Sequence, residues 1–185
     1  MQSETLYQGR WLNLKRRGQW EYAERVHPGG AVAILAVNDD ARIVLVEQPR
    51  VPIGRTTIEL PAGLVGDIAG ASNEDIASAA RRELEEETGY TCGNVELLHS
   101  GPTSAGMSTE FIHFVHATGL CKIGAGGGDE TEDITVHEVP LAGIDAWLAE
   151  RAARGDSVDP KLMAGLWLLQ HPRRYNGADV AFTGG

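Results

Sequence analysis

EDIASAARRELEEETGY, residues 74–90, is the stretch of sequence that decides the fold. Its apolar and charged positions repeat with the period of an α-helix, and Gly89 is a typical C-terminal cap, so we expect a helix over about Asn73–Thr88. At about 100° per residue, three carboxylates share one arc of this helix with its apolar positions: Glu83, Glu86 and Glu87. Glu85 points the other way and is expected to be solvated.

Like charges three and four residues apart repel one another, and partial burial increases the cost. A divalent cation bound to Glu83, Glu86 and Glu87 would remove that cost, and oxygen ligands of this kind suit Mg²⁺ or Mn²⁺. Arg82 lies four residues before Glu86 and can orient it as an i,i+4 pair. For an arbitrary acidic run, a solvated helix face is the alternative. The apolar neighbours favour a metal site.

The same residues resemble the Nudix box, in which a glycine, a glutamate and seven further residues precede Arg-Glu-Leu-x-Glu-Glu-x-Gly and an apolar residue. The match extends from Glu74 to Tyr90. The family has five residues between the glycine and the first glutamate, whereas Gly63 and Glu74 are separated by ten. We take Gly63 as the box glycine and assign the extra residues to a longer loop over about Val65–Ser72.

Short strands and two further helices surround this helix in the sequence. We expect strands at Trp11–Leu14, Trp20–Arg25, Ala31–Val37, Arg42–Glu47, Val95–Ser100, Glu110–Thr118 and Ile134–Val139, and helices near Leu141–Arg154 and Pro160–Gln170. Strands mixed with few helices predict α/β or α+β layers. The resemblance implies a Nudix-type α/β/α sandwich with a mixed β-sheet and an N-terminal β-strand arm. We assign residues 1–28 to the arm, which contributes to the dimer and the base pocket, and residues 29–185 to the hydrolase domain.

The resemblance also implies Mg²⁺-dependent hydrolysis of a pyrophosphate bond, with Mn²⁺ as a substitute. The implied metal ligands are the Ala62 carbonyl and the carboxylates of Glu83, Glu86, Glu87 and Glu132. The implied catalytic residues are Glu130 as general base, Glu86 and Arg82. Glu130 and Glu132 follow the glycine run 126–128, which we expect to let the loop move over substrate. A solvated acidic turn is the alternative for this loop.

Flanking segments are similar to the ADP-ribose and nucleoside diphosphate sugar pyrophosphatase branch. The implied substrate-binding residues are Trp11, Trp20, Arg50, Glu59, Gly106 and Met107. The arginine matching Arg50 contacts the diphosphate in that branch, although a surface arginine after a strand is the alternative. Trp11 and Trp20 would stack on adenine, and the alternative is that they anchor the core or a dimer interface.

The expected reaction is hydrolysis of ADP-ribose to AMP and ribose 5-phosphate, or of a related nucleoside diphosphate sugar. Ala105 stands where ADP-ribose enzymes usually carry proline, and Glu110–Phe114 resembles GDP-mannose pyrophosphatases, which keeps that substrate as the alternative. A non-catalytic Nudix-fold ligand sensor is the alternative from another class. Such a sensor should have lost box glutamates, and here they are all present.

Composition narrows the remaining function classes. A net charge of −10 over 185 residues argues against a nucleic-acid polymer as partner. The 2 cysteines match no zinc or disulfide framework, and we see neither a signal peptide nor a membrane-spanning run, so we expect a cytoplasmic protein with no membrane partner. The resemblance implies a homodimer. His113 and His137 lie in strand-like runs and are expected to be structural.

Overall fold

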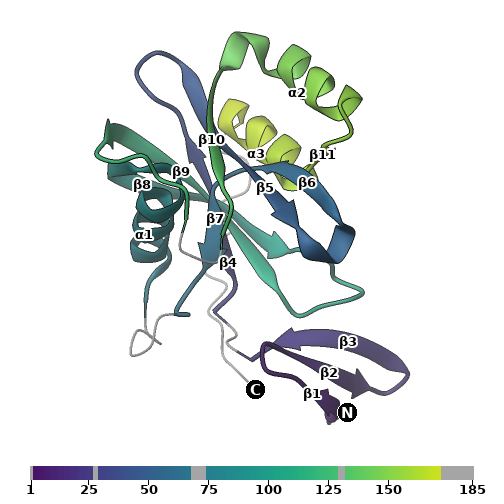
Figure 1. Cartoon of the computed structure of the whole chain (residues 1–185). Coiled ribbons are helices and arrows are strands. Elements are labelled where there is room, and N and C mark those ends of the chain that lie inside the picture. Colours follow the sequence, from purple (N-terminus) through teal and green to yellow (C-terminus); the bar gives the residue numbers. More distant parts are fainter. Residues whose placement is uncertain (1, 27–28, 68–73, 129–131, 172–185) are drawn as a thin grey trace.

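A computed structural model describes residues 2–26, 29–67, 74–128 and 132–171. The described residues form three β-sheets (Figure 1). The arm sheet has the order β1-β2-β3, with β1 (Glu4–Gln8), β2 (Leu12–Arg17) and β3 (Trp20–Arg25). The second has the order β10-β5-β6-β11, with β10 (Thr135–Pro140), β5 (Arg42–Arg50), β6 (Arg55–Glu59) and β11 (Ser157–Val158). The third has the order β7-β4-β9-β8, with β7 (Ala62–Leu64), β4 (Ala31–Ala36), β9 (Phe111–Lys122) and β8 (Tyr90–Pro102).

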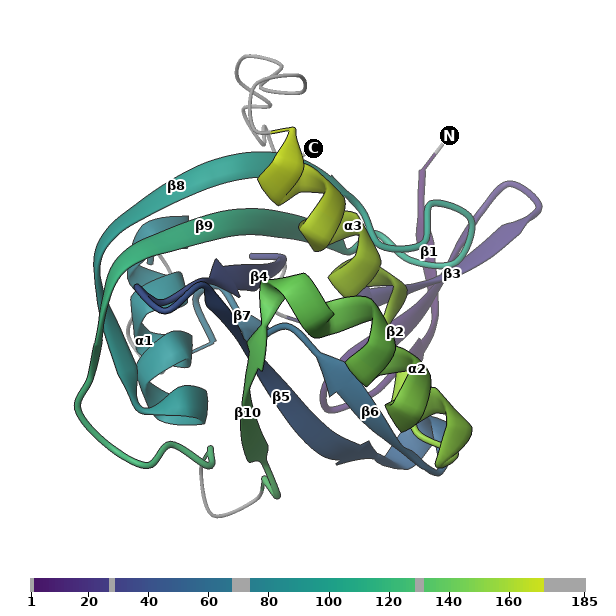
Figure 2. The same ribbon diagram turned by 90° about the horizontal axis from the view of Figure 1, so that it is seen from above.

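The two four-stranded sheets lie between helices. Helix α1 (Ile76–Thr88) covers one side, and α2 (Ile144–Ala153) and α3 (Pro160–Gln170) cover the other (Figure 2). Each of these sheets combines antiparallel pairs with one parallel pair, β4 with β9 and β6 with β11. The expected α/β/α layering is therefore confirmed, with the mixed sheet divided in two.

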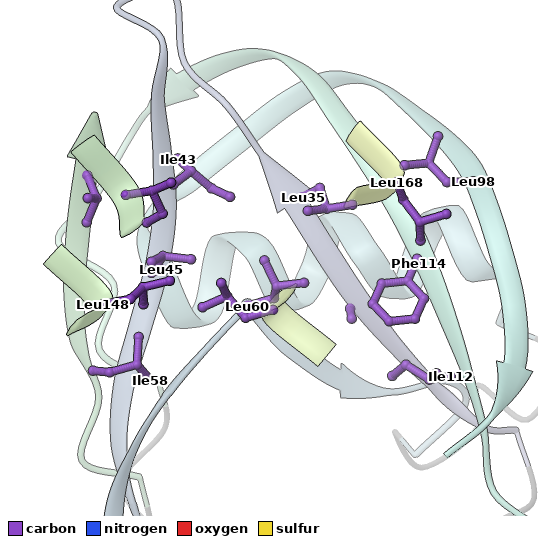
Figure 3. Packing of buried hydrophobic residues seen from close by; sticks show 14 residues of the cluster. Leu35, Ile43, Leu45, Ile58, Leu60, Leu98, Ile112, Phe114, Leu148 and Leu168 are labelled. Carbon is purple, nitrogen blue, oxygen red and sulfur yellow. The ribbon is translucent and has the colours of Figure 1, made fainter. Parts of the chain in front are cut away.

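Strand β4 separates two hydrophobic cores because its side chains alternate between its faces. Val32 and Ile34 pack in the cluster that includes α1, and Leu35 packs in the cluster that includes α2 and α3. Figure 3 shows this second cluster, in which Leu35 and Phe114 lie close to Leu168 of α3. None of the described helices is long and apolar enough to cross a membrane.

Local capping sets the ends of the helices. Asp75 caps α1 by accepting a hydrogen bond from the Ser78 N–H at 2.9 Å, so the helix begins at Ile76, later than the predicted Asn73. Gly89 ends α1 with φ +70°, as expected. Helix α3 has the predicted bounds, and the predicted closing helix at residues 141–154 divides into a 3-10 turn, Leu141–Gly143, and α2.

Several strands differ from the sequence prediction. β8 and β9 are much longer than expected because they pair antiparallel along their whole lengths. β1, β6, β7 and β11 were not predicted. β7 and β11 have only three and two residues, too few for a pattern to show, and β6 is recognisable only through its pairing with β5.

The arm sheet docks on the loop between β8 and β9. The Ala23 N–H donates to the Met107 carbonyl at 2.8 Å, and the Thr109 N–H donates to the Ala23 carbonyl at 3.1 Å. Arg25 forms an ion pair with Glu110. These contacts place the end of β3 beside the start of β9.

Two adjacent residues of α3 allow a test of the hydrophobic cluster that includes α2 and α3. Leu162 is fully buried, whereas Met163 is 48% exposed. We expect Leu162→Ala to lower the free energy of unfolding by about 2–5 kcal/mol, because it leaves a cavity. Met163→Ala is the matched control and should change it by less than about 0.5 kcal/mol. Urea unfolding followed by circular dichroism measures both, and equal losses would contradict this packing.

Candidate active site

One pocket of about 590 Å³ brings together most of the residues singled out in the sequence. An acidic wall from β7, α1 and the segment before β10 carries Ala62, Gly63, Arg82, Glu83, Glu86 and Glu132. A second wall from β5, β6 and the start of α3 carries Arg50, Ile53, Thr57, Glu59, Asp159 and Lys161. The third wall, beside the arm, includes Arg25, Thr103, Glu110 and Ile112. The pocket thus lies where both central sheets, α1, α3 and the arm converge.

Gly63 leaves room for the carboxylate of Glu83. A Cβ atom added at Gly63 would lie 1.8 Å from the Glu83 Cδ atom, so any side chain there would displace the Glu83 carboxylate from this position. The close approach explains why glycine is needed on β7 at this point, and it supports Gly63 as the box glycine. The box is thus a contact between β7 and α1 as well as a helix motif.

Glu83 and Glu87 are buried at this contact, with relative exposures of 8% and 2%. Burial raises the pKa of Glu83 to about 7, although the Arg82 guanidinium opposes the shift. Burial also raises the pKa of Glu87 to about 8, against a hydrogen bond from the Ala62 N–H at 3.0 Å. The charges of Glu83 and Glu132 raise the pKa of Glu87 further. Both carboxylates therefore need a proton or a cation near neutral pH.

Arg82 is bonded to the carboxylates around it. Its guanidinium donates to Glu83 at 2.7 Å and to Glu86 at 3.2 Å, so the expected i,i+4 contact is present. It also donates to both oxygens of Glu74 at 3.1 Å and to Asp67 at 3.2 Å. Burial opposes the change, but Glu74 and Glu83 together raise the pKa of Arg82. Arg82 therefore stays charged and positions this wall.

Glu74 helps to position Arg82. It precedes α1, and its carboxylate also accepts a hydrogen bond from the Gly66 N–H at 2.9 Å. The hydrogen bond from Arg82 lowers the pKa of Glu74. Of the longer loop expected at 65–72, residues 68–72 lie outside the described residues. Asp67 was not predicted, and its contact with Arg82 brings it to the pocket.

The acidic wall fits a hard divalent cation by the chemistry of its donors. Apart from Arg82, its side chains offer carboxylate oxygens as ligands. Glu83 on this wall and Glu87, which does not line the pocket, are both buried without a full counter-charge. In the described part of the chain, no three Asp, Glu, His or Cys side chains are arranged to hold one ion as they stand. Arg82 donates hydrogen bonds to Glu83 and Glu86, so these two carboxylates are paired with the guanidinium.

The glycine run 126–128 is bonded to the end of α1. The Gly127 N–H donates to the Glu87 carbonyl at 2.8 Å, and the Gly128 N–H donates to the Glu86 carbonyl at 3.0 Å. A Cβ atom at Gly126 would lie 2.4 Å from the Thr88 backbone, and all three glycines have positive φ. At Gly126, glycine therefore permits close backbone contact, and the expected movement of the loop over substrate stays a prediction. Glu132 lines the pocket, and Glu130 lies outside the described residues.

Arg50 and Glu59 form a bidentate pair across β5 and β6. Arg50 Nε and Nη2 each donate to a Glu59 oxygen at 2.7 Å, and Glu59 is 4% exposed. The hydrogen bond from Arg50 to Glu59 raises the pKa of Arg50, and the charges of Glu87 and Asp159 raise it further. Arg50 is therefore part of the pocket rather than an isolated surface arginine.

The four remaining predicted substrate residues lie outside the pocket, and Trp11 and Trp20 stand at opposite ends of the β2–β3 pair. Trp11 and Trp20 are 63% and 62% exposed, so the alternative that they belong to this chain's core is wrong. Gly106 lies beside Trp20, because a Cβ atom there would be 3.9 Å from the Trp20 ring. Met107, the next residue, is exposed. None of the four lines the pocket formed by the described residues.

The two predicted structural histidines lie away from the pocket lining. His113 is buried and shares a hydrogen bond of 2.7 Å with the Ser100 hydroxyl. His137 lies 2.7 Å from a Glu47 oxygen and packs against the Trp147 ring. Both side chains have partners within the fold.

The sequence prediction missed the residues that complete the second and third walls: Arg25, Thr57, Glu110, Asp159 and Lys161. Asp159 was recognisable only as a helix cap. Glu110 was recognisable only as part of the segment Glu110–Phe114. The other three carry no local pattern, because the contacts that assemble these walls join residues far apart in the chain.

Comparisons with known proteins agree with this geometry. Residues 27–158 match the model of the NUDIX domain. The chain is 38% identical over 148 residues to a methanol dehydrogenase activator of Bacillus methanolicus, covering 76% of this chain and 77% of that protein. It is 36% identical over 171 residues to an ADP-ribose pyrophosphatase of Mycobacterium tuberculosis, covering 89% and 79%.

A GDP-mannose pyrophosphatase of Citrobacter koseri is 37% identical over 120 residues, covering 60% of each chain. The crystal structure of an ADP compounds hydrolase superposes with a TM-score of 0.70 at 21% identity, covering 92% of this chain and 91% of that one, which shows the shared fold. The box geometry at Gly63, Glu83 and Arg82 and the domain match lead to one conclusion: the chain belongs to the Nudix hydrolase family.

Proposed function

We propose that this protein hydrolyses the pyrophosphate bond of a nucleoside diphosphate sugar, with ADP-ribose giving AMP and ribose 5-phosphate. One observation carries the proposal: the buried carboxylate of Glu83 lines a pocket large enough for such a substrate, and the buried carboxylate of Glu87 accepts a hydrogen bond from Ala62 of the same wall. The ADP-ribose and GDP-mannose pyrophosphatases among its relatives support this substrate class.

Nudix hydrolases generally need a divalent metal, and we propose Mg²⁺, with Mn²⁺ as a substitute. Its ligands would be the Ala62 carbonyl and the carboxylates of Glu83, Glu86, Glu87 and Glu132. When bound, the metal would neutralise phosphate charge and lower the pKa of water. Arg82 would hold the glutamates in place, and Glu130 would act as general base.

The Arg50–Glu59 pair would bind the diphosphate region of the substrate. Arg50 lines the pocket with its guanidinium fixed by two hydrogen bonds, so little side-chain entropy is lost when it meets an anion. Glu59 keeps that guanidinium oriented. The buried carboxylate therefore acts through the arginine in this proposal.

Residues 1–28 would serve as the arm of the dimer and base pocket, and residues 29–185 as the hydrolase domain. The exposure of Trp11 and Trp20 supports binding of a base or of a second copy, because large aromatic rings seldom face water without a partner. Gly106 and Met107 lie close enough to the arm to share this pocket. We keep the cytoplasm as the expected compartment, which the free thiols of Cys92 and Cys121 support.

Two other functions have specific support. Ala105 and the relative from Citrobacter koseri favour GDP-mannose as an alternative substrate. The relative from Bacillus methanolicus is a methanol dehydrogenase activator, which favours a regulatory Nudix protein. The complete set of box glutamates makes hydrolysis the stronger proposal.

A substrate panel tests the proposed function directly. With Mg²⁺, the wild type should release product from ADP-ribose or GDP-mannose, a chelator should abolish release, and Glu87→Gln should lower kcat by orders of magnitude. The panel is scored by phosphate release after coupling to a phosphatase. Glu85→Gln is the matched control, because that side chain is exposed and lies outside the pocket lining. Full activity of Glu87→Gln would rule out the metal assignment.

The raised pKa values of Glu83 and Glu87 predict how stability depends on pH without metal. Both values lie above the ordinary 4.5, so the stabilisation from the bound protons is complete below about pH 4.5 and disappears as pH rises through 7 and 8. The Tm in a chelator should therefore fall over this range more steeply for the wild type than for Glu87→Gln. Added Mg²⁺ should restore the Tm of the wild type at pH 8. Parallel curves for both proteins would show that Glu87 does not titrate as described.

If Trp20 helps to form the base pocket, its removal should weaken the binding of ADP-ribose. Trp20→Ala should raise the KM for ADP-ribose more than it lowers kcat, because stacking binds ground and transition states alike. Steady-state kinetics measures the role of Trp20 in substrate binding, and size-exclusion chromatography measures its role in a dimer. A loss of dimer with unchanged KM in the residual dimer would favour an interface role instead.

A further inference from the structure

Thr57 has a buried hydroxyl without a partner at the wall of the pocket. It lies on β6, is 5% exposed and lines the pocket. Among the described residues, no group forms a hydrogen bond with its Oγ1 atom. A buried hydroxyl left unbonded costs free energy, and such groups generally have a partner in protein, water or ligand. The Oγ1 atom itself is closed to solvent, so a ligand in the pocket can supply the partner when the Thr57 side chain turns toward it.

The start of α3 lies beside Thr57 because β11 pairs with β6. Ser157 is the parallel partner of Thr57, and the Asp159 N–H donates to the Ile58 carbonyl at 3.0 Å. Asp159 then caps α3 by accepting from the Lys161 N–H at 2.8 Å, and its carboxylate also forms an ion pair with the Lys161 ammonium. Asp159 and Lys161 both line the pocket.

The charges at the start of α3 cancel, because the Lys161 ammonium is paired with the Asp159 carboxylate. A phosphate bound at this pair would meet one negative charge for its one positive charge. A neutral group with several hydroxyls suits this part of the wall better, because the carboxylate accepts hydrogen bonds and the ammonium donates them.

We propose that Thr57, Asp159 and Lys161 form a subsite for the hydroxyl groups of a sugar ring of the substrate. The Thr57 hydroxyl makes one hydrogen bond to the ring, Asp159 accepts another and Lys161 donates a third. The subsite rests on the proposed function, since it binds part of the same nucleoside diphosphate sugar. It explains why a pocket with an acidic wall also has a charge-balanced one.

Thr57→Val tests the subsite, because valine keeps the shape of threonine and removes the hydroxyl. Thr56→Val is the matched control: Thr56 lies next on β6, where side chains alternate between faces, and is outside the pocket lining. Thr57→Ser keeps the hydroxyl and should retain wild-type behaviour. Because the lost hydroxyl has no partner among the described residues, Thr57→Val should keep or raise the Tm.

The kinetic comparison uses three substrates with Mg²⁺. One is ADP-ribose, the second is the ethyl ester of ADP, which lacks the terminal sugar, and the third is an ADP-ribose analogue whose adenosine lacks its 2′ and 3′ hydroxyls. Thr57→Val should raise the KM for ADP-ribose by about fivefold, the effect of one neutral hydrogen bond. The increase in KM should disappear with the one substrate that lacks the sugar hydroxyls bound by Thr57. That substrate shows whether Thr57 binds the terminal sugar or the ribose of the adenosine. Thr56→Val should give no increase with any of them.

Two results would overturn the subsite: an unchanged KM for Thr57→Val with ADP-ribose, or an equal increase with all three substrates. Lys161→Gln should follow the pattern of Thr57→Val, and a uniform loss for both variants would indicate a structural role. If the wild type hydrolyses none of the substrates, the proposed function fails instead. In that case, calorimetry with Ca²⁺ gives the dissociation constants of the same compounds, and these are compared between the wild type and Thr57→Val.

Discussion

The burial of Glu83 and Glu87 between α1 and β7 is the constraint on which the rest of the site depends. Two carboxylates removed from water must be compensated, and the fold does so with the Ala62 N–H and the Arg82 guanidinium. The space comes from Gly63, where any side chain would overlap the Glu83 carboxylate. The packing of helix on strand and the chemistry of the box are therefore one arrangement.

Much of this arrangement could be predicted from the sequence because it is local to one helix. The spacing of Glu83, Glu86 and Glu87 places them on a shared arc, and Arg82 reaches Glu86 within one turn. Helical periodicity could not show that Glu86 remains largely exposed while Glu87 is buried, since that difference depends on β7. The long gap after Gly63 also concealed how Glu74 reaches Arg82 from outside the helix.

The walls of the pocket opposite the Nudix box could not be predicted from the sequence, because their residues meet only in the folded chain. Thr57 and Asp159 are about a hundred residues apart and meet only through the two-residue strand β11, which is too short to have a recognisable pattern. Arg25 and Glu110 likewise meet only when the arm docks. In contrast, Arg50 and Glu59 stand in motifs that could be recognised in the sequence, and the pairing of β5 with β6 brings them together.

The hydrogen bonds from Gly127 and Gly128 to the end of α1 decide where this chain can change in length. These bonds hold Gly127 and Gly128 to the carbonyls of Glu87 and Glu86, so the segment that leads to Glu132 starts from a fixed point. Insertions before Gly126 would leave that point in place, whereas one added residue between Gly128 and Glu132 would lengthen the chain from that point to Glu132, while the pairing of β10 with β5 holds the residues from Thr135 onward. The tolerance of the family fold for longer loops should therefore differ on the two sides of these glycines.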